Sequence, residues 1–373
     1  MKIIKILFNS IVAFIIIFIL INIFISYFWE LKTNYKINKM NPYTDTVLMS
    51  LGLNSQEGLQ LYKETWINRK YDYDQFTEYA EHKTLNNKYL NISSENGRKI
   101  LNNKNCTRNF FFYGSSVTFG YNVTDEQTHP SYFKKILDEN HTQSYCVYNY
   151  GRAGYDSTRE NILFLKHLLN KKIKKRDFIF FIDGSAESGN KDGINTQFLR
   201  RAQRIISQKY WDMYKHTFPF LIESLPVFQL VTRAKQKFNW NEDDQNTIIS
   251  DEEILHVFQI NVNIRKAICE ELELNCFSFL HPFSLLHGKY FSKYEKSGAI
   301  ETEMLKIGSD ISEIINRKKK SFQNLKKAKN IIDISPALNK TSEISYVDRG
   351  HFSPNANKNI AKFIYFLIKE KIE

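Results

Sequence analysis

Two adjacent serines follow a strongly aromatic run in the segment FFFYGSSVTFG, residues 110–120. Gly114 allows a tight turn from a strand into a helix at this point. A serine at the start of that helix would lie among outward-pointing backbone N–H groups, which can hold a developing oxyanion. Serine is also a common helix N-cap, so the stretch alone fits either a nucleophile or a cap.

An aspartate and a histidine stand three residues apart near the other end of the chain, in YVDRGHFSPNANKNIA. A serine hydroxyl is a weak nucleophile unless a base removes its proton, and a carboxylate must orient that base and stabilise its cation. In a turn, Asp348 can reach one imidazole nitrogen of His351 while the other nitrogen faces a serine. An isolated Asp-x-x-His would be an ordinary surface turn, but together with the serine turn it predicts acyl transfer.

A parallel sheet would bring these two segments together. Three short apolar runs each end in glycine, and helical stretches separate them: RNFFFYG, YCVYNYG and RDFIFFIDG. Strands that alternate with helices favour a parallel sheet with helices on both faces. Ligands bind such sheets at the carboxyl ends of the strands. The ends of all three runs should therefore meet at one site.

A glycine after the second run is a candidate oxyanion donor. In NYGRAGYDS, the backbone N–H of Gly154 could be a second oxyanion donor, although a plain turn would also use glycine here. In FIDGSAES, Gly184 marks the turn after the third strand.

From residue 106 to residue 373 the chain resembles the SGNH (GDSL-type) hydrolase superfamily. GSSVTFG matches the family's first block, Gly-Asp-Ser-x-x-x-Gly, Gly154 matches its oxyanion glycine, and Asp348 and His351 match its closing Asp-x-x-His. The order and separation of the blocks agree as well. Residues 73–99 further resemble the leader of membrane-anchored members, and CFSFLHP resembles a strand that ends in Gln-Pro in that group.

The resemblance implies a three-layer α/β/α sandwich of the flavodoxin-like type around a central parallel sheet. It also implies roles for individual residues. Ser116 would be the nucleophile, His351 the general base and Asp348 the residue that orients His351. The backbone N–H groups of Ser116 and Gly154 would form the oxyanion hole.

The chain departs from the family pattern at two places. Ser115 stands where the first block has Asp, a position that is not the nucleophile. The third block, Gly-x-Asn-Asp, reads Gly184, Ser185, Ala186, Glu187 here. Ala186 cannot donate to an oxyanion as the Asn side chain does, and loss of one such donor can cost about 10²–10³ in rate. Ser185 or Asn190 could replace it and contact substrate; otherwise the enzyme would be slow or inactive.

The chain begins with an apolar segment that differs in composition from everything after it. Residues 6–29 carry no charge and are long enough to span a bilayer. No short h-region with a small-residue cleavage site is evident, so we expect an uncleaved transmembrane anchor over 1–30. A membrane-proximal leader with some helix should follow over 31–105, and the SGNH-like domain over 106–373 should carry a helical insertion at about 190–250. Lysines flank both ends of the anchor, so its orientation stays open.

Charge and cysteine content narrow the cellular setting. The net charge of +12 is spread along the chain, so the basic run NRKKKSFQNLKKAKN is interpreted as a solvated helix face and no nucleic-acid partner is expected. Cys106 and Cys146 should meet at one end of the sheet, and Cys269 and Cys276 bracket a helix-to-strand corner. Two disulfides would suit an oxidising compartment, with four buried thiols as the alternative. The sequence contains no CxxC pair, so a zinc site is not indicated. Neither a metal nor a cofactor is expected.

These patterns together predict a single-pass membrane protein whose extracytoplasmic, periplasmic domain is a serine esterase. Its substrate would be an O-acyl ester, above all an O-acetyl group on an envelope or secreted polysaccharide. One alternative keeps the site and passes the acyl group to a sugar hydroxyl, with the insertion excluding water. The other is a catalytically impaired domain that binds glycan.

Overall fold

The computed structural model describes most of the chain, including all of the segments that carry the candidate site. The described residues are 2–69, 71–74, 77–81, 84–93, 97–102, 105–184, 186–187, 225–230, 250–284, 319–339, 343–348 and 350–372. Most of the expected insertion at 190–250, together with Ser185 and Asn190, lies outside them. The chain divides into two compact units, one of residues 1–40 and 194–247 and one of residues 41–193 and 248–373.

The first unit contains helix α1, Lys2–Asn38. Residues 4–38 of this helix are long and apolar enough to cross a membrane, a property that signal sequences near an N-terminus share. Its apolar side chains are largely exposed. The polar Asn22, in contrast, is buried. Its side chain donates a hydrogen bond to the Phe18 carbonyl and accepts one from the Val227 N–H at 3.2 Å. The short helical segment at 226–230 therefore satisfies a polar group within the apolar helix.

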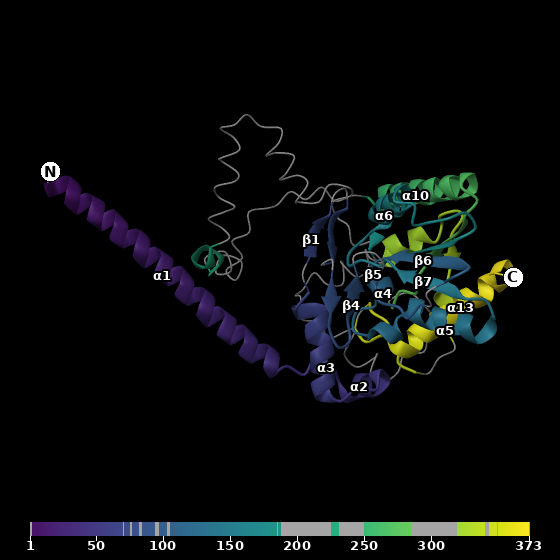
Figure 1. Ribbon diagram of the computed structural model, residues 1–373, viewed down its shortest axis with the longest axis horizontal. Helices are drawn as coiled ribbons and strands as arrows, with labels where there is room; N and C mark the ends of the chain where they lie inside the picture. The colour runs from purple at the N-terminus through teal and green to yellow at the C-terminus, as the bar shows by residue number, and fades with distance from the viewer. Residues whose placement is uncertain are drawn as a thin grey trace. The chain divides into compact units, whose positions relative to one another are not determined.

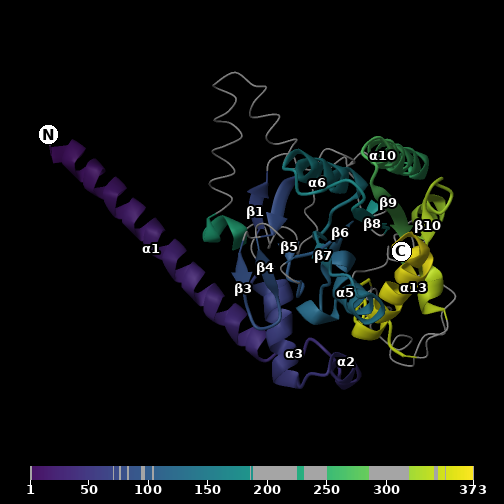
Figure 2. The same ribbon diagram turned by 45° about the vertical axis from the view of Figure 1, so that its right-hand side comes forward.

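The second unit is built on an eight-stranded sheet of order β10-β9-β8-β6-β7-β5-β4-β3 (Figure 2). The central strands β7, β6, β8, β9 and β10 are all parallel, in the flavodoxin-like order 2-1-3-4-5. Their bounds are β6 Arg108–Gly114, β7 Tyr145–Asn149, β8 Phe178–Asp183, β9 Asn275–Leu280 and β10 Ile332–Asp333. The predicted α/β class with a central parallel sheet is confirmed.

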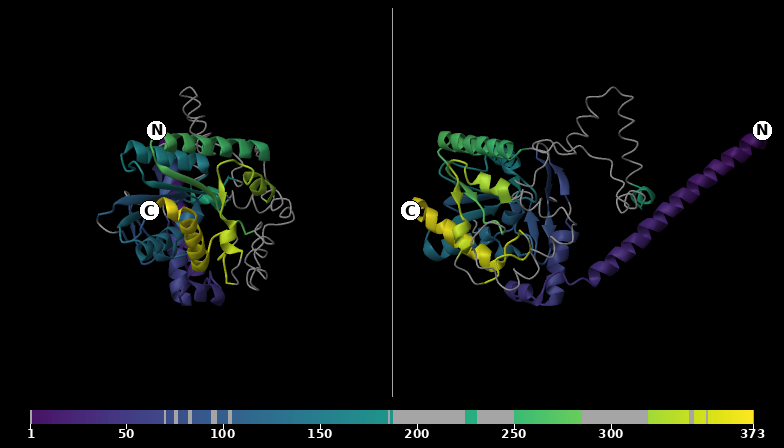
Figure 3. Two further views of the ribbon diagram at one scale, coloured as in Figure 1. Left: turned by 90° about the vertical axis from the view of Figure 1, so that its right-hand side faces the viewer. Right: turned by 180° about the vertical axis from the view of Figure 1, so that it is seen from behind.

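Helices cover both faces of the sheet, which makes three layers (Figures 1 and 3). In β6, Phe110 and Phe112 face the helices α5 and α13, whereas Phe111 and Tyr113 face α6. This alternation follows from the two-residue period of a strand. Because both faces of β6 are covered by helices, residues 110–113 can all be aromatic and still be buried. The helix bounds are α4 Ser116–Phe119, α5 His129–Asn140, α6 Ser157–Leu169, α10 Asp251–Glu271 and α13 Pro354–Ile372, with 3₁₀ turns η2 Asp125–Gln127 and η5 Ser335–Leu338.

The leader contributes strands as well as helices. Strands β3, β4 and β5 extend the sheet beyond β7, with β5 parallel to β7 and the other two antiparallel. The leader elements are α2 Asp45–Leu51, α3 Ser55–Tyr62, π-helix η1 Lys63–Ile67, β1 Tyr71–Asp74, β2 Glu78–Glu81, β3 Leu85–Asn86, β4 Asn91–Ser93 and β5 Gly97–Arg98. Part of the leader thus shares one sheet with the segment that resembles a hydrolase.

All four cysteines are paired, Cys106 with Cys146 and Cys269 with Cys276. The first bridge joins the segment just before β6, which holds Cys106, to the neighbouring parallel strand β7, which contains Cys146. The second bridge connects the end of α10 to β9. Of the alternatives left open by the sequence, the disulfides are the ones present in the structure.

Candidate active site

The first candidate residue lies at the carboxyl end of the central strand. β6 ends at Gly114, Ser115 is the N-cap of α4, and Ser116 is the first residue of that helix. A Cβ on Gly114 would lie 2.1 Å from Oγ1 of Thr118, so only glycine fits beneath this first helical turn. Ser115 is only 3% exposed, whereas Ser116 is half-buried and can meet a substrate.

His351 lies between this serine and Asp348. The Ser116 Oγ is 3.0 Å from His351 Nε2, and His351 Nδ1 is 2.7 Å from the nearer oxygen of Asp348. Because an ionised carboxylate can only accept, Nδ1 must carry the proton, which leaves Nε2 free to accept from the serine hydroxyl. The three side chains therefore form one hydrogen-bonded chain with the tautomer that a general base requires.

Asp348 stays ionised because its oxygens accept several hydrogen bonds. Burial by itself raises the pKa of this carboxyl, but the neighbouring His351 and the backbone N–H groups of Gly350 and His351 outweigh that effect and lower its pKa to about 2. The two N–H groups donate to one oxygen at 2.9 and 2.8 Å. The turn that holds them is closed by the Val347 N–H, which donates to the His351 carbonyl.

The other oxygen of Asp348 has a partner that the sequence pattern did not suggest. Asn122 Nδ2 donates to it at 2.7 Å. The Asn122 Oδ1 in turn accepts from the Tyr43 hydroxyl at 2.8 Å and from the Trp66 indole N–H at 2.5 Å. Tyr43 and Trp66 both belong to the leader, so the leader reaches the candidate site.

Aromatic rings enclose the imidazole of His351. Trp66 approaches it edge-on at 5.4 Å between ring centroids, and Tyr121 lies at 5.1 Å. Trp66 and Tyr121 also contact one another at 4.4 Å. Such packing limits rotation of the His351 ring and excludes water from its sides.

The loop after β7 carries the candidate oxyanion glycine. The Arg152 N–H donates to the Gly114 carbonyl, which ties this loop to the end of β6. Gly154 has a positive φ of 69°, a conformation that favours glycine. The Tyr79 hydroxyl donates to the Ala153 carbonyl at 2.7 Å, and the Ala153 N–H donates to Glu81 at 3.1 Å. Strand β2 of the leader therefore holds Ala153, the residue before Gly154, by both its carbonyl and its N–H.

The segment after β8 has no side-chain amide at residue 186, the position of Asn in the family pattern. Ala186 is half-buried and carries no polar side-chain atom. The next residue, Glu187, accepts hydrogen bonds from the backbone N–H and the hydroxyl of Ser157 and so caps helix α6. Burial and the nearby charge of Asp156 raise the pKa of Glu187 well above its usual value. This segment therefore contacts helix α6 through Glu187 and offers no side-chain amide at residue 186.

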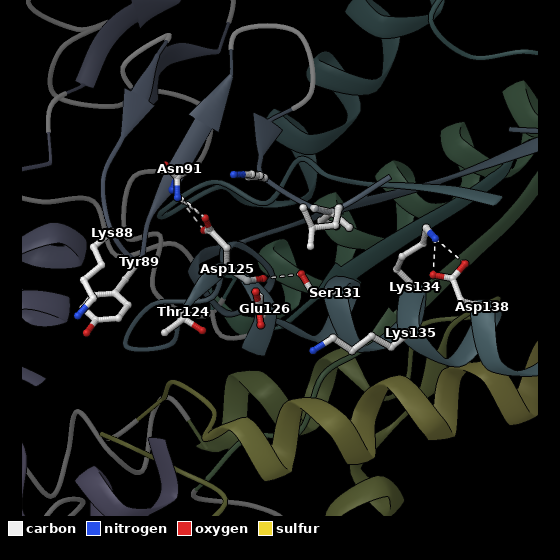
Figure 4. A pocket seen from close by; sticks show the side chains of 13 residues that line it. Lys88, Tyr89, Asn91, Thr124, Asp125, Glu126, Ser131, Lys134, Lys135 and Asp138 are labelled. Atoms are coloured by element: carbon white, nitrogen blue, oxygen red, sulfur yellow. Dashed lines mark hydrogen bonds and ion pairs between the residues drawn. The ribbon is translucent and has the colours of Figure 1, made fainter. Parts of the chain in front are cut away.

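A pocket of about 510 Å³ lies beside strand β4 and helix α5, and it is not the candidate active site (Figure 4). Its lining includes Lys88, Asn91, Asp125 and Lys135, but neither Ser116 nor His351. Asn91 and Asp125 point toward one another across it and are hydrogen bonded at 2.8 Å. Within the described ranges, no cluster of three or more His, Cys, Asp or Glu residues could hold a metal ion.

The structure thus brings Ser116, His351 and Asp348 together and places Gly154 on a loop tied to the end of β6. It adds six residues that sequence reasoning missed: Tyr43, Trp66, Tyr79, Glu81, Tyr121 and Asn122. The only local signal for any of them is the Asn that follows Gly120 by two residues, since glycine and asparagine both favour left-handed turns.

No protein-family model and no curated protein matches the chain. Several solved structures do. One is the acetylxylan esterase Axe2 from Geobacillus stearothermophilus, 13% identical over 70% of this chain and 94% of that chain, with a TM-score of 0.34. Another is the lipase/acylhydrolase from Enterococcus faecalis, 15% identical over 71% and 97% of the two chains, with a TM-score of 0.36.

A third is a protein from Desulfitobacterium hafniense described as lipolytic and of the G-D-S-L family, 12% identical over 70% and 99% of the two chains, with a TM-score of 0.34. The matched structures are thus esterases, lipases and a G-D-S-L protein.

Proposed function

We propose that this protein is a membrane-anchored serine esterase of the SGNH type. The observation that supports it best is the continuous chain of hydrogen bonds from Ser116 through His351 to Asp348, at 3.0 and 2.7 Å. A histidine held in the required tautomer beside a half-buried serine is what activates a hydroxyl nucleophile. A serine that only capped α4 would need neither the base nor its carboxylate.

In the proposed reaction the Ser116 Oγ attacks the ester carbonyl while His351 Nε2 takes the hydroxyl proton. The resulting imidazolium lies against the Asp348 carboxylate, which stays ionised because its pKa is about 2. His351 then gives the proton to the departing alcohol, and an acyl group remains on Ser116. Water, deprotonated by the same His351, releases the acid and restores the serine.

The oxyanion would be held by two backbone N–H groups, those of Ser116 and Gly154. The Ser116 N–H lies at the first position of α4, where a backbone amide has no acceptor within the helix. Ala186 adds no third donor. We therefore propose an enzyme slower than one with the complete set, by up to about 10²–10³. Ser185 and Asn190 remain proposed substrate-contact residues.

The proposed substrate is an O-acetyl ester on a cell-envelope or secreted polysaccharide. Both disulfides suit an oxidising compartment, and α1 is long enough to hold the protein at a membrane. We therefore propose that the domain is extracytoplasmic, in the periplasm. This position would give the site access to acylated polysaccharide and not to cytoplasmic esters.

Acetate release by the purified full-length protein tests the proposal. We expect slow hydrolysis of p-nitrophenyl acetate and of an O-acetylated polysaccharide, abolished in both cases by Ser116→Ala. Adding an unacetylated oligosaccharide as acceptor separates the alternatives, because an acyltransferase would transfer acetate to it. Glycan binding without release or transfer of acetate would leave only a binding role and overturn the esterase.

A further inference from the structure

We infer that Tyr43 and Trp66 of the leader are positioning residues for the reaction, acting through Asn122 on Asp348. The inference deepens the proposed esterase and rests on it. It makes the leader part of the active site, although residues 41–69 lie far from Ser116 and His351 in the sequence.

The direction of the Asn122 amide is fixed by its partners. The Trp66 indole N–H can only donate, so the atom it meets must be the amide oxygen. The Tyr43 hydroxyl donates to the same oxygen. Burial, followed by the negative charge of Asp348, raises the pKa of Tyr43, so this hydroxyl keeps its proton at working pH.

With the oxygen held in this way, the Asn122 NH₂ group must face Asp348, where it donates at 2.7 Å. If the amide turned over, its carbonyl oxygen would meet a carboxylate and repel it. Asp348 would then rotate away from His351 Nδ1. Tyr43 and Trp66 therefore determine whether the second oxygen of Asp348 meets a donor or an acceptor.

The backbone also favours asparagine at this position. Asn122 has a φ of 63°, a left-handed conformation that asparagine tolerates better than most residues. It follows Gly120, the left-handed C-cap of α4. The turn that ends the nucleophile's helix therefore points a side-chain amide toward the carboxylate of Asp348.

Apolar packing holds the leader on both catalytic loops. Val47, Leu48 and Leu51 of α2 form one buried cluster with Val123 and Val347. Val123 follows Asn122 directly, and Val347 precedes Asp348. The same cluster includes Tyr43, which is only 5% exposed. The hydrogen bonds from the leader thus act within a packed interface, where they are well oriented.

A set of variants in the full-length protein tests this relay. Asn122→Gly removes the amide without straining the left-handed backbone, and we expect kcat to fall about tenfold with KM unchanged. Trp66→Phe and Tyr43→Phe each remove one donor and keep a ring, and each should lower kcat about threefold. In the Asn122→Gly background Tyr43→Phe should have no further effect, because it acts through the missing amide, and Trp66→Phe should keep only the smaller effect of its direct contact with the His351 ring.

Tyr89→Phe is the matched control. It also removes a hydroxyl from a tyrosine of the same buried cluster, but none of its hydrogen bonds reaches Asn122, so its kcat should equal that of the wild type. If Trp66→Phe and Tyr43→Phe keep full activity, or remain equally harmful in the Asn122→Gly background, the inference is wrong.

A readout without turnover separates this inference from the esterase proposal. The His351 Nδ1–H bound to Asp348 should give a low-field proton resonance that Asp348→Asn lacks. We expect this resonance to weaken in Asn122→Gly and Trp66→Phe and to persist in Tyr89→Phe, even if the wild type hydrolyses nothing. An inactive wild type would refute the esterase alone, whereas an unchanged resonance in both variants would refute the relay.

Discussion

At the scale of single residues, the candidate site combines a histidine that is held in place on several sides with a proposed oxyanion hole that lacks a side-chain amide at residue 186. His351 is held by a carboxylate, a serine and two aromatic rings. The Ala186 side chain, by contrast, offers no donor to a developing negative charge. The rate should therefore be limited by stabilisation of the oxyanion and not by activation of Ser116.

A side-chain amide placed at residue 186 tests whether oxyanion stabilisation limits the rate. Ala186→Asn should raise kcat at least about tenfold toward p-nitrophenyl acetate, since one oxyanion donor is worth about 10²–10³. Ala186→Asp is the matched control, because it has the same shape and no N–H donor, and it should not raise kcat. An unchanged rate in Ala186→Asn would mean that another group already fills this place.

The ionisation of Asp348 should appear in the pH dependence of stability. Its folded-state pKa of about 2 lies below the ordinary value of 3.8, so the ionised group contributes stability that is complete above about pH 5 and lost as the pH falls toward 2. Asp348→Asn lacks this contribution. The difference in free energy of unfolding between wild type and variant should therefore shrink between about pH 6 and pH 2.5.

Denaturant titrations at several pH values measure this difference. A difference that stays constant over the range would show that the pKa of Asp348 is the same in the folded and unfolded states.

Sequence reasoning found the residues that carry a chemical signature and missed those that only support them. The sequence pointed to Ser116 and His351, which lie 3.0 Å apart in the structure, because the proposed roles of nucleophile and base have few residue types to choose from. Asn122, Tyr43 and Trp66 were missed because their roles depend on long-range pairing. Asn122 and Asp348 are 226 residues apart in sequence, and no local pattern encodes such a pair.

At the scale of elements, strand β2 determines the shape of the loop that carries Gly154. The Tyr79 hydroxyl binds the Ala153 carbonyl, and Glu81 binds the Ala153 N–H. A peptide unit's N–H points away from its carbonyl. Holding the Ala153 carbonyl on one side therefore directs the N–H of Gly154 to the other side.

Removing the Tyr79 hydroxyl should weaken the oxyanion hole without unfolding the protein. Burial raises the pKa of Tyr79 to about 12, so its hydroxyl remains a donor throughout the working range. We expect Tyr79→Phe to lower kcat about tenfold with little change in the melting temperature, since the ring and its packing remain. Tyr132→Phe, on α5, is a control that should match the wild type. Equal kcat values for the two variants would refute the role of β2.

The central elements were predictable, and the edge of the sheet was not. Residues 108–114 form the expected strand, and helix α5 is one of the expected helical stretches between the strands, because long apolar or periodic runs have few alternatives. The basic run was interpreted as a solvated helix face, and in its described part Lys320, Lys326 and Lys327 are exposed while Phe322 and Leu325 are buried. Strands β3, β4 and β5 have only two or three residues each, too few to show a period.

At the scale of the whole molecule, the apolar helix α1 and the proposed catalytic site belong to different compact units. The second unit starts at residue 41, so it keeps Tyr43, Trp66 and all strands of the large sheet. A chain of residues 41–373 should therefore keep the proposed activity without its anchor. A chain of residues 106–373 loses the leader and should lose activity.

Membrane fractionation and esterase assays of both truncated chains check this expectation. Residues 41–373 should move to the soluble fraction and retain most of the kcat, whereas residues 106–373 should be inactive or insoluble. Full activity of residues 106–373 would contradict the place given to the leader.

Covalent labelling of Ser116 tests the central claim most directly. A fluorophosphonate probe reacts with a serine only when a base activates it and the site is open. We expect the full-length protein to carry one probe molecule, mapped by mass spectrometry to the peptide that contains Ser116, and we expect no labelling in Ser116→Ala or His351→Ala. Failure of the folded wild type to react, or labelling that persists in both variants, would contradict the assignment of Ser116 as an activated nucleophile.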